Sequence, residues 1–294
     1  TIAAGLVVLV VLGAIAITTV RRAWPAFDEM GLDFVTSSRW DPNSGQFGAK
    51  AFLYGSLVAS AIALVLAVPV SIGIALFTTQ VLPVRWRRPV IYLVDLLAVV
   101  PSVVFGLWGI LFFAKKLPGF YGNVHDLLGP VPVIGDLFGD PKGRSFMTAG
   151  MILAIMITPI ITSLAREVID TTPATDREGA YALGATRWEM IRGAVLPHSK
   201  GGLVGAVMLG LGRAMGETIA VALVIGSTAN VSSNLFASGD ALPARIANEW
   251  GEADGTWRAA LIGLAVTLFV ITIVVNLAAT TVVNRSLSKS QGAR

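Results

Sequence analysis

Two charged residues lie inside a stretch that is otherwise apolar enough to cross a membrane. The segment GLGRAMGETIAVALVIG, residues 210–226, contains Arg213 and Glu217. A charge at the bilayer centre costs roughly 2.5–3.5 kcal/mol on insertion scales, so the two side chains must be paired or hydrated. Four residues apart on one helix, they lie on the same face and are predicted to form an ion pair. In this interpretation Arg213 offers positive charge to an anion, and Glu217 keeps the guanidinium oriented.

The same two residues can instead have a structural role. A buried ion pair can fix the register between two subunits without adding stability. Gly212 and Gly216 stand beside the pair and form a GxxxG seam, which lets another helix backbone approach closely. The sequence therefore leaves two interpretations open, an anion path and a contact between subunits.

The composition places these residues in a membrane protein. Of the 294 residues, 54% are hydrophobic and 14% are charged, with a mean hydropathy of +0.74. About a quarter of the residues of a soluble domain are charged. The chain has no cysteine and two histidines, so neither a disulfide framework nor a cysteine- or histidine-rich metal site is expected. The formal net charge of +4 is too small to indicate a nucleic-acid partner.

The apolar runs predict an all-α polytopic membrane protein with six transmembrane helices. A helix crosses the hydrocarbon layer with about 20 apolar residues. The loops at residues 81–88 and 166–200, and the tail after residue 283, are denser in Lys and Arg than the opposite loops, which predicts that they and both termini are cytoplasmic. The six runs are Thr1–Val20, Ala51–Thr79, Pro89–Ala114, Ser145–Ala165, Gly201–Ala229 and Ala259–Val283.

The loop between the fourth and fifth runs contains two helix starts. Thr175-Asp176-Arg177-Glu178 has the pattern of a capping box, and Thr186-Arg187-Trp188-Glu189 repeats it. Gly184 is expected to end the first helix in a left-handed conformation, and Pro197 to end the second. The pattern predicts two short helices at an angle, an elbow suited to docking another protein. A solvated surface loop and a nucleic-acid helix-turn-helix are the alternatives.

The segment EGAYALGATRWEMIRGAVLP, residues 178–197, resembles the EAA loop of ABC importer permeases. The family pattern is E-A-A, three residues, G, nine residues and I-x-L-P; Gly179 replaces the first Ala of this pattern and Ala194 the Ile. In that family the loop is the coupling helix, which sits in a groove of the ATP-binding subunit. The resemblance implies this coupling role for Glu178, Gly179, Ala180, Gly184, Leu196 and Pro197.

The stretch RAMGETIAV, residues 213–221, resembles R-A-[LM]-G-E-T-x-A-V in the permeases of the Pst phosphate importers, the PstC type more than the PstA type. Members of that family need an Arg and a Glu in this helix for phosphate transport, which implies such a role for Arg213 and Glu217. The implied fold is that of a type I (MetI-like) ABC importer permease. Its transmembrane domain would cover residues 51–283, with the coupling loop at 171–200, after an N-terminal helix and outer loop at 1–50 and before a cytoplasmic tail at 284–294.

The resemblance also implies an assembly in the bacterial plasma (inner) membrane. In it, the chain would form the translocation path for phosphate with a PstA-like permease, above two PstB-like ATPases and below a PstS-like binding protein. The sequence contains no G-x-x-x-x-G-K-[ST] motif, so ATP and Mg are expected on the partner ATPase and the chain is expected to be no enzyme, with no catalytic residues. A permease for sulfate or molybdate, and an ATP-independent anion transporter, remain the alternatives.

Overall fold

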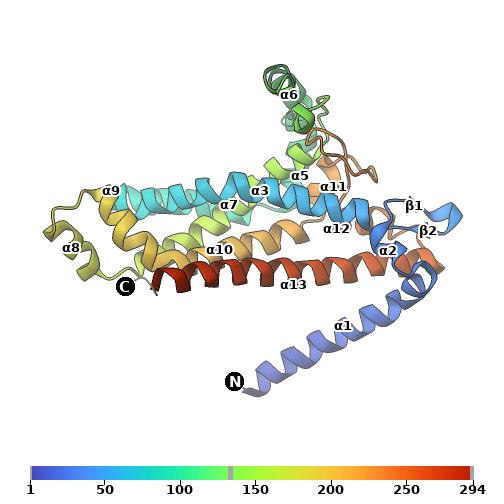
Figure 1. Ribbon diagram of the computed structural model, residues 1–294, viewed down its shortest axis with the longest axis horizontal. Helices are drawn as coiled ribbons and strands as arrows, with labels where there is room; N and C mark the ends of the chain where they lie inside the picture. Colours follow the sequence, from blue (N-terminus) through green and yellow to red (C-terminus); the bar gives the residue numbers. More distant parts are fainter. Residues whose placement is uncertain (1, 132–134, 292–294) are drawn as a thin grey trace. The chain divides into compact units, whose positions relative to one another are not determined.

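A computed structural model describes residues 2–131 and 135–291. The chain divides into two compact units, each assembled from segments that are distant in sequence. Unit 1 comprises residues 1–59, 106–149 and 215–273, and unit 2 comprises residues 60–105, 150–214 and 274–294. Four long helices contribute residues to both units (Figure 1): α3 (Lys50–Leu76), α7 (Phe146–Asp170), α10 (Leu196–Gly216) and α13 (Gly255–Gln291).

The described residues contain six helical segments that are long and apolar enough to cross a membrane. This finding confirms the prediction of an all-α polytopic fold with six spans. Their bounds differ from the predicted ones, most of all in the third and fifth spans. The segments are Gly5–Met30, Lys50–Val81, Ser102–Leu128, Phe146–Asp170, Arg187–Gly216 and Gly255–Thr281.

The third predicted run, residues 89–114, is not one helix. Helix α4 (Val84–Val99) ends at Val100, which is extended with ψ 126°, and α5 (Ser102–Trp108) begins after Pro101. Proline has no N–H to donate and disfavours helical conformation in the residue before it, so the chain breaks there. Helix α5 continues through the π-helical turn η3 (Gly109–Phe113) into α6 (Ala114–Leu128), which shifts the third span toward the C-terminus.

Unit 1 is built around a core of aromatic and aliphatic side chains. Phe34, Phe47 and Phe52 are almost fully buried and pack with Leu242 and Leu261. The strands β1 and β2 pair in antiparallel fashion, with Trp40 opposite Phe47. The elements of this unit, in addition to α5, α6 and η3, are α1 (Ile2–Met30), α2 (Asp33–Thr36), β1 (Trp40–Asp41), η1 (Pro42–Ser44), β2 (Gln46–Phe47), the start of α3 (Lys50–Leu76), η4 (Gly135–Leu137), α11 (Ile219–Val224), α12 (Leu242–Glu249) and the first part of α13 (Gly255–Gln291).

Unit 2 holds the loop that the sequence predicts as an elbow. Helix α10 lies close against α7. A Cβ added at Gly202 would clash with the Val168 side chain, and one added at Gly210 would lie 2.6 Å from the Ile161 side chain. Arg166 pairs with Asp95 at 3.9 Å, whereas Arg87 donates to backbone carbonyls. Besides α4 and most of α3, the elements are η2 (Phe77–Val81), α7 (Phe146–Asp170), α8 (Ala174–Ala182), α9 (Arg187–Met190), η5 (Ile191–Val195) and α10 (Leu196–Gly216).

The C-terminal tail predicted from residue 284 begins inside a helix. Helix α13 runs from Gly255 to Gln291, well beyond the end of the predicted sixth span at Val283. Thr1 of the first predicted span, residues 132–134 of the predicted outer loop and residues 292–294 of the predicted tail lie outside the described residues.

Candidate transport path and coupling surface

The fifth predicted span is interrupted at its charged residues. Helix α10 ends at Gly216, Glu217 and Thr218 are not helical, and α11 begins at Ile219. The Glu217 side chain is buried, and its Oε1 accepts a hydrogen bond from the backbone N–H of Ala220 at 3.3 Å. The first amides of a helix have no partner within the helix, and a side-chain oxygen placed here satisfies one of them. Glu217 therefore fixes the start of α11.

The predicted ion pair between Arg213 and Glu217 is wrong. The i, i+4 geometry requires a continuous helix, and this helix stops between the two residues. Arg213 is exposed, and within residues 2–131 and 135–291 neither residue takes part in an ion pair. The break directs the carboxylate to the backbone N–H of Ala220, and the guanidinium of Arg213 has no ion-pair partner among the described residues.

The face of α10 that carries Arg213 is open. A Cβ at Gly205, Gly212 or Gly216 would meet nothing within 4 Å, in contrast to the glycines of α10 that pack on α7. Leu209 on this face is 61% exposed. The GxxxG seam of Gly212 and Gly216 is thus uncovered and available to another backbone, and its use by a partner helix remains a prediction.

The loop after α7 folds into the predicted pair of short helices, here called the coupling elbow (α8 and α9, residues 174–190). Gly184 lies between them with φ +82°, the left-handed conformation that glycine adopts without steric cost. Thr186 and Glu189 form a full capping box: the hydroxyl accepts from the Glu189 N–H at 3.4 Å, and the carboxylate accepts from the Thr186 N–H at 2.7 Å. The predicted left-handed conformation of Gly184 and the predicted capping box at Thr186 are confirmed.

Two details of the predicted elbow are wrong. The capping box at Thr175 and Glu178 does not form, because α8 begins at Ala174 after Pro173 and Thr175 is already inside the first turn. Pro197 does not end the second helix, because the chain passes from α9 through the π-helical turn η5 into α10. Pro197 lacks the N–H that would continue the helical hydrogen bonds, and the π-helical turn η5 lies directly before this interruption of the ladder.

The underside of the elbow is anchored in the core of unit 2. Met190, Ile191 and Val195 are buried there, and Ala180 and Leu196 pack against the same cluster. Arg177 donates from Nη2 to the carbonyl of Ile169 at 3.1 Å, which ties α8 to the end of α7.

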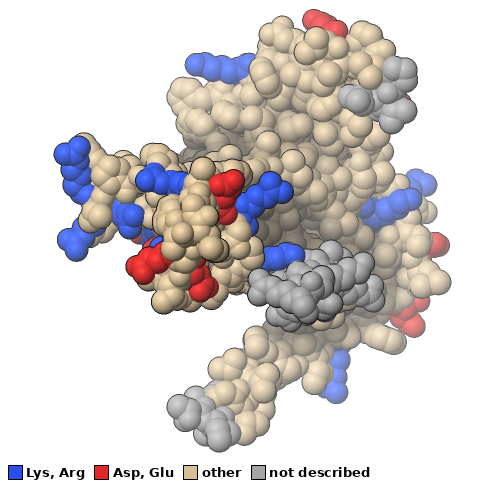
Figure 2. Space-filling model, turned by 60° about the vertical axis from the view of Figure 1, so that its left-hand side comes forward, with Lys and Arg blue, Asp and Glu red and all other residues tan. Residues whose placement is uncertain are grey.

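The outer surface of the elbow is both apolar and charged. Leu183 is 90% exposed, Trp188 61% and Tyr181 46%, while Glu178 is also exposed. Figure 2 shows charged side chains of both signs gathered at this end of unit 2. Among the residues that the resemblance implies for coupling, the structure places Glu178, Gly179, Gly184 and Pro197 at the surface and Ala180 and Leu196 against the core.

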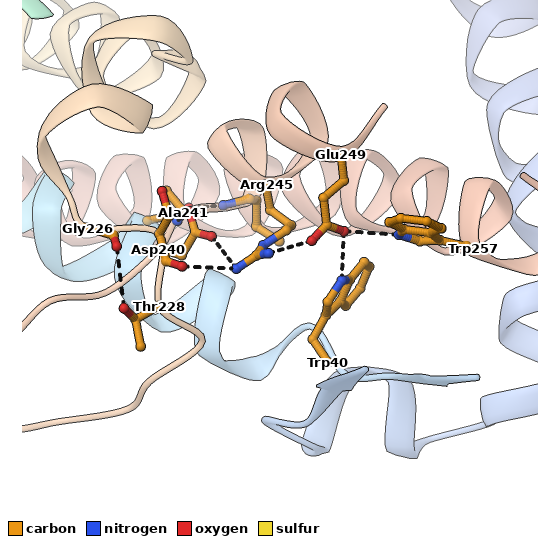
Figure 3. Close-up of polar contacts among 11 residues, drawn as sticks. Trp40, Gly226, Thr228, Asp240, Ala241, Arg245, Glu249 and Trp257 are labelled. Atoms are coloured by element: carbon orange, nitrogen blue, oxygen red, sulfur yellow. Dashed lines mark hydrogen bonds and ion pairs between the residues drawn. The ribbon is translucent and has the colours of Figure 1, made fainter. Parts of the chain in front are cut away.

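Sequence reasoning missed a second cluster of charges, in unit 1, here called the ionic network (Asp240, Arg245, Glu249, Trp40 and Trp257; Figure 3). Arg245 pairs with Asp240 at 2.7 Å and with Glu249 one turn further along α12. The other carboxylate oxygen of Glu249 accepts from the indole nitrogens of Trp40 at 2.8 Å and Trp257 at 3.0 Å. The network thereby joins β1, α12 and α13.

Burial dominates the electrostatics of Asp240. Its side chain is completely buried, and this burial raises the pKa of the carboxyl above its ordinary value, while the neighbouring Arg245 opposes the rise. The Arg245 guanidinium also lies 4.9 Å from the ring centroid of Phe52. The i, i+4 spacing of Arg245 and Glu249 could have indicated their pairing, but no sequence signal connects either residue to Trp40 or Asp240.

The six spans and the elbow define a membrane permease of the ABC importer class. The family described as binding-protein-dependent transport system inner membrane component matches residues 67–288. Among solved structures, the permease fold of a bacterial alginate ABC transporter matches with a TM-score of 0.61 at 16% identity, covering 97% of this chain and 92% of that one. The MetNI methionine ABC transporter matches with a TM-score of 0.57 at 17% identity, covering 81% and 93%.

The chain belongs to the PstC family of phosphate transport system permease proteins. It is 43% identical to the PstC protein of Mesorhizobium japonicum over 93% of this chain and 84% of that protein. It is 42% identical to PstC of Haemophilus influenzae, over 92% and 86%, and 41% identical to PstC 2 of Mycobacterium tuberculosis, over 94% and 87%. These relatives are transport permeases, and the chain is a multi-pass membrane protein of the same kind.

Proposed function

We propose that this chain is the permease subunit of an ATP-driven importer of inorganic phosphate in the bacterial plasma membrane. The observation that carries the proposal is the identity of 41–43% to phosphate transport system permeases over more than nine-tenths of the chain. The RAMGETIAV stretch contains the break between α10 and α11, directly after the end of the fifth spanning segment at Gly216.

The coupling elbow is the proposed docking site for the ATPase. Its apolar side chains, Leu183, Trp188 and Tyr181, are exposed on a pre-formed structure, so their burial by a partner adds hydrophobic stabilisation without a cost for ordering the loop. The anchored underside passes movement of the elbow to α7 and α10, because Met190 and Val195 are packed in the core of unit 2. ATP and Mg would be bound by two PstB-like partner subunits.

Arg213 and Glu217 are the proposed residues of the anion path, but with separate tasks. Arg213 is exposed and unpaired among the described residues, and so it can attract a phosphate group. Glu217 positions the backbone where α10 gives way to α11. A PstA-like sister permease would cover the open glycine face of α10 and complete the path, and a PstS-like protein would deliver phosphate from outside.

Copurification tests the assembly. The chain is tagged, extracted in mild detergent from cells that express the whole gene cluster, and its partners are identified by mass. We expect a second six-span permease and a P-loop ATPase; recovery of a lone homo-oligomer would favour an ATP-independent transporter. Uptake of labelled phosphate in competition with unlabelled phosphate, sulfate and molybdate then tests the identity of the anion. Stronger competition by sulfate or molybdate than by unlabelled phosphate would contradict the proposed substrate.

Glu217→Gln tests the charge apart from the cap. The amide keeps an oxygen that can accept from Ala220 N–H, so the α10–α11 break should persist and the complex should still copurify. We expect phosphate uptake to fall at least tenfold, because the field around Arg213 changes when the negative charge is removed. Glu217→Ala removes charge and cap together and should also lower thermal stability. Normal uptake by Glu217→Gln would exclude a role for the charge.

A further inference from the structure

Unit 1 contains a groove of about 440 Å³ between α1, α12 and α13. On α1 it is lined by Thr18, Thr19 and Arg22, on α12 by Ile246, in the turn directly after α12 by Trp250, and on α13 by Leu261 and further apolar residues. Figure 1 shows the C-terminal end of α1 and the first part of α13 converging near α2. The groove is separate from the coupling elbow and from the α10–α11 break.

The groove lies at the depth of lipid headgroups. The apolar run of α1 ends at Val20, and about 20 helical residues at 1.5 Å each span the hydrocarbon layer of roughly 30 Å, so Arg22 stands at its boundary. The apolar run of α13 begins directly after Arg258. The Arg258 guanidinium lies 5.8 Å from the ring centroid of Trp250, and tryptophan favours this interfacial layer.

Arg22 has no counter-ion within the part of the chain that the structure describes. Among the described residues it forms neither a hydrogen bond nor an ion pair. Glu249, the acid of α12, already binds Arg245 and two tryptophans, and Glu252 and Asp254 in the turn after α12 form no ion pair with Arg22. A guanidinium at a membrane boundary without a carboxylate can be satisfied by a phosphate, which matches its planar set of donors.

We propose that this groove is a binding site for an anionic phospholipid. Its phosphate sits on Arg22 beside Trp250, and its acyl chain runs between α1 and α13 over Leu261. The apolar part of α1 is open to an acyl chain, since Leu9 is 69% exposed and 6% of the apolar window of the first span is buried. A lipid is favoured over free phosphate because the groove continues from the cation into apolar surface.

The absence of cysteine allows a local test. Thr19→Cys in the full chain is labelled with a small fluorophore, and the chain is reconstituted in phosphatidylcholine vesicles that contain traces of brominated phosphatidylglycerol or brominated phosphatidylcholine. We expect brominated phosphatidylglycerol to quench the fluorophore about fivefold more effectively than brominated phosphatidylcholine, the preference expected from one arginine near a membrane surface. Val20→Cys, at the same depth but outside the lining of the groove, should show a ratio near one.

The adjacent arginines provide the matched control. Arg22→Gln should abolish the preference for phosphatidylglycerol at Thr19→Cys, and Arg21→Gln, whose side chain does not line the groove, should preserve it. If Arg22→Gln and Arg21→Gln lowered the preference for phosphatidylglycerol equally, the preference would arise from the general positive charge of this segment, and the proposal would be overturned. A preference unchanged by Arg22→Gln would also overturn it. Loss of quenching on addition of 10 mM inorganic phosphate would identify a free-anion site instead of a lipid site.

Discussion

The coupling elbow and the ionic network both contain charged and aromatic side chains, but they differ in how exposed these side chains are and in how far apart in sequence their contacts lie. The elbow holds its structure by local contacts, a capping box within four residues and a left-handed glycine, and leaves its charged and aromatic side chains exposed. The network buries the Asp240 carboxylate and connects positions as distant in sequence as Trp40 and Glu249. This difference supports the proposed role of the elbow as a docking surface, whereas the contacts of the network hold β1, α12 and α13 of unit 1 together.

Arg245→Leu should have the largest effect on stability and breaks the network. Removal of one partner from a buried ion pair leaves uncompensated charge and costs about 3–5 kcal/mol. Asp240 and Glu249 would both lose their cation. The measurement is the thermal unfolding midpoint in detergent; Arg39→Leu, which replaces an exposed arginine of the same unit, should change stability by less than about 0.5 kcal/mol.

The same variant should respond to pH in a defined direction. The pKa of Asp240 is raised in the folded state, so the folded protein binds more protons and stability falls as pH rises from about the ordinary value of 3.8. Without Arg245 the pKa rises further, and the loss of stability should therefore be greater at pH 7 than at pH 4. An equal loss of stability at pH 4 and pH 7 would show that ionisation of the Asp240 carboxyl is not the cause of the destabilisation.

Gly184→Ala tests the elbow at its left-handed residue. A Cβ there meets nothing within 4 Å, so the cost arises from the backbone at φ +82° and amounts to about 1–2 kcal/mol. We expect weakened coupling between ATP hydrolysis and uptake in the purified complex. Gly193→Ala makes the same change at an open helical position and should leave coupling intact; equal effects of the two variants would show that the turn at Gly184 is not needed.

Substitutions in the two threonine motifs of the elbow should have the smallest effects on stability, and the two motifs should respond differently. Thr186→Ala removes an observed capping box and should destabilise the elbow by about 1 kcal/mol, whereas Thr175→Ala removes the same pattern where no box forms and should have little effect. Hydrogen exchange of residues 186–190 provides the measurement. Faster exchange after both changes would contradict the different roles that the structure gives them.

The local features of the elbow could be predicted because their partners lie within a few residues. Thr186, Glu189 and Gly184 form their contacts inside one turn, so the sequence pattern contains the whole interaction. The Thr175 pattern is equally good in sequence and still fails, because α8 begins at Ala174, two residues before the start that a cap at Thr175 requires. Local patterns thus predict a cap only when the helix start is independently known.

The sequence by itself determined the class of the protein, since six apolar runs leave a chain no soluble alternative. It did not determine the break between Arg213 and Glu217, because the charged pair fits a continuous helix as well as an interrupted one. Only the tertiary structure decided that Glu217 binds the backbone of α11, that Asp240 pairs with Arg245, and that Trp40 donates to Glu249. The physical reason is that burial makes an unpaired charge costly, and its partner is chosen by proximity in space.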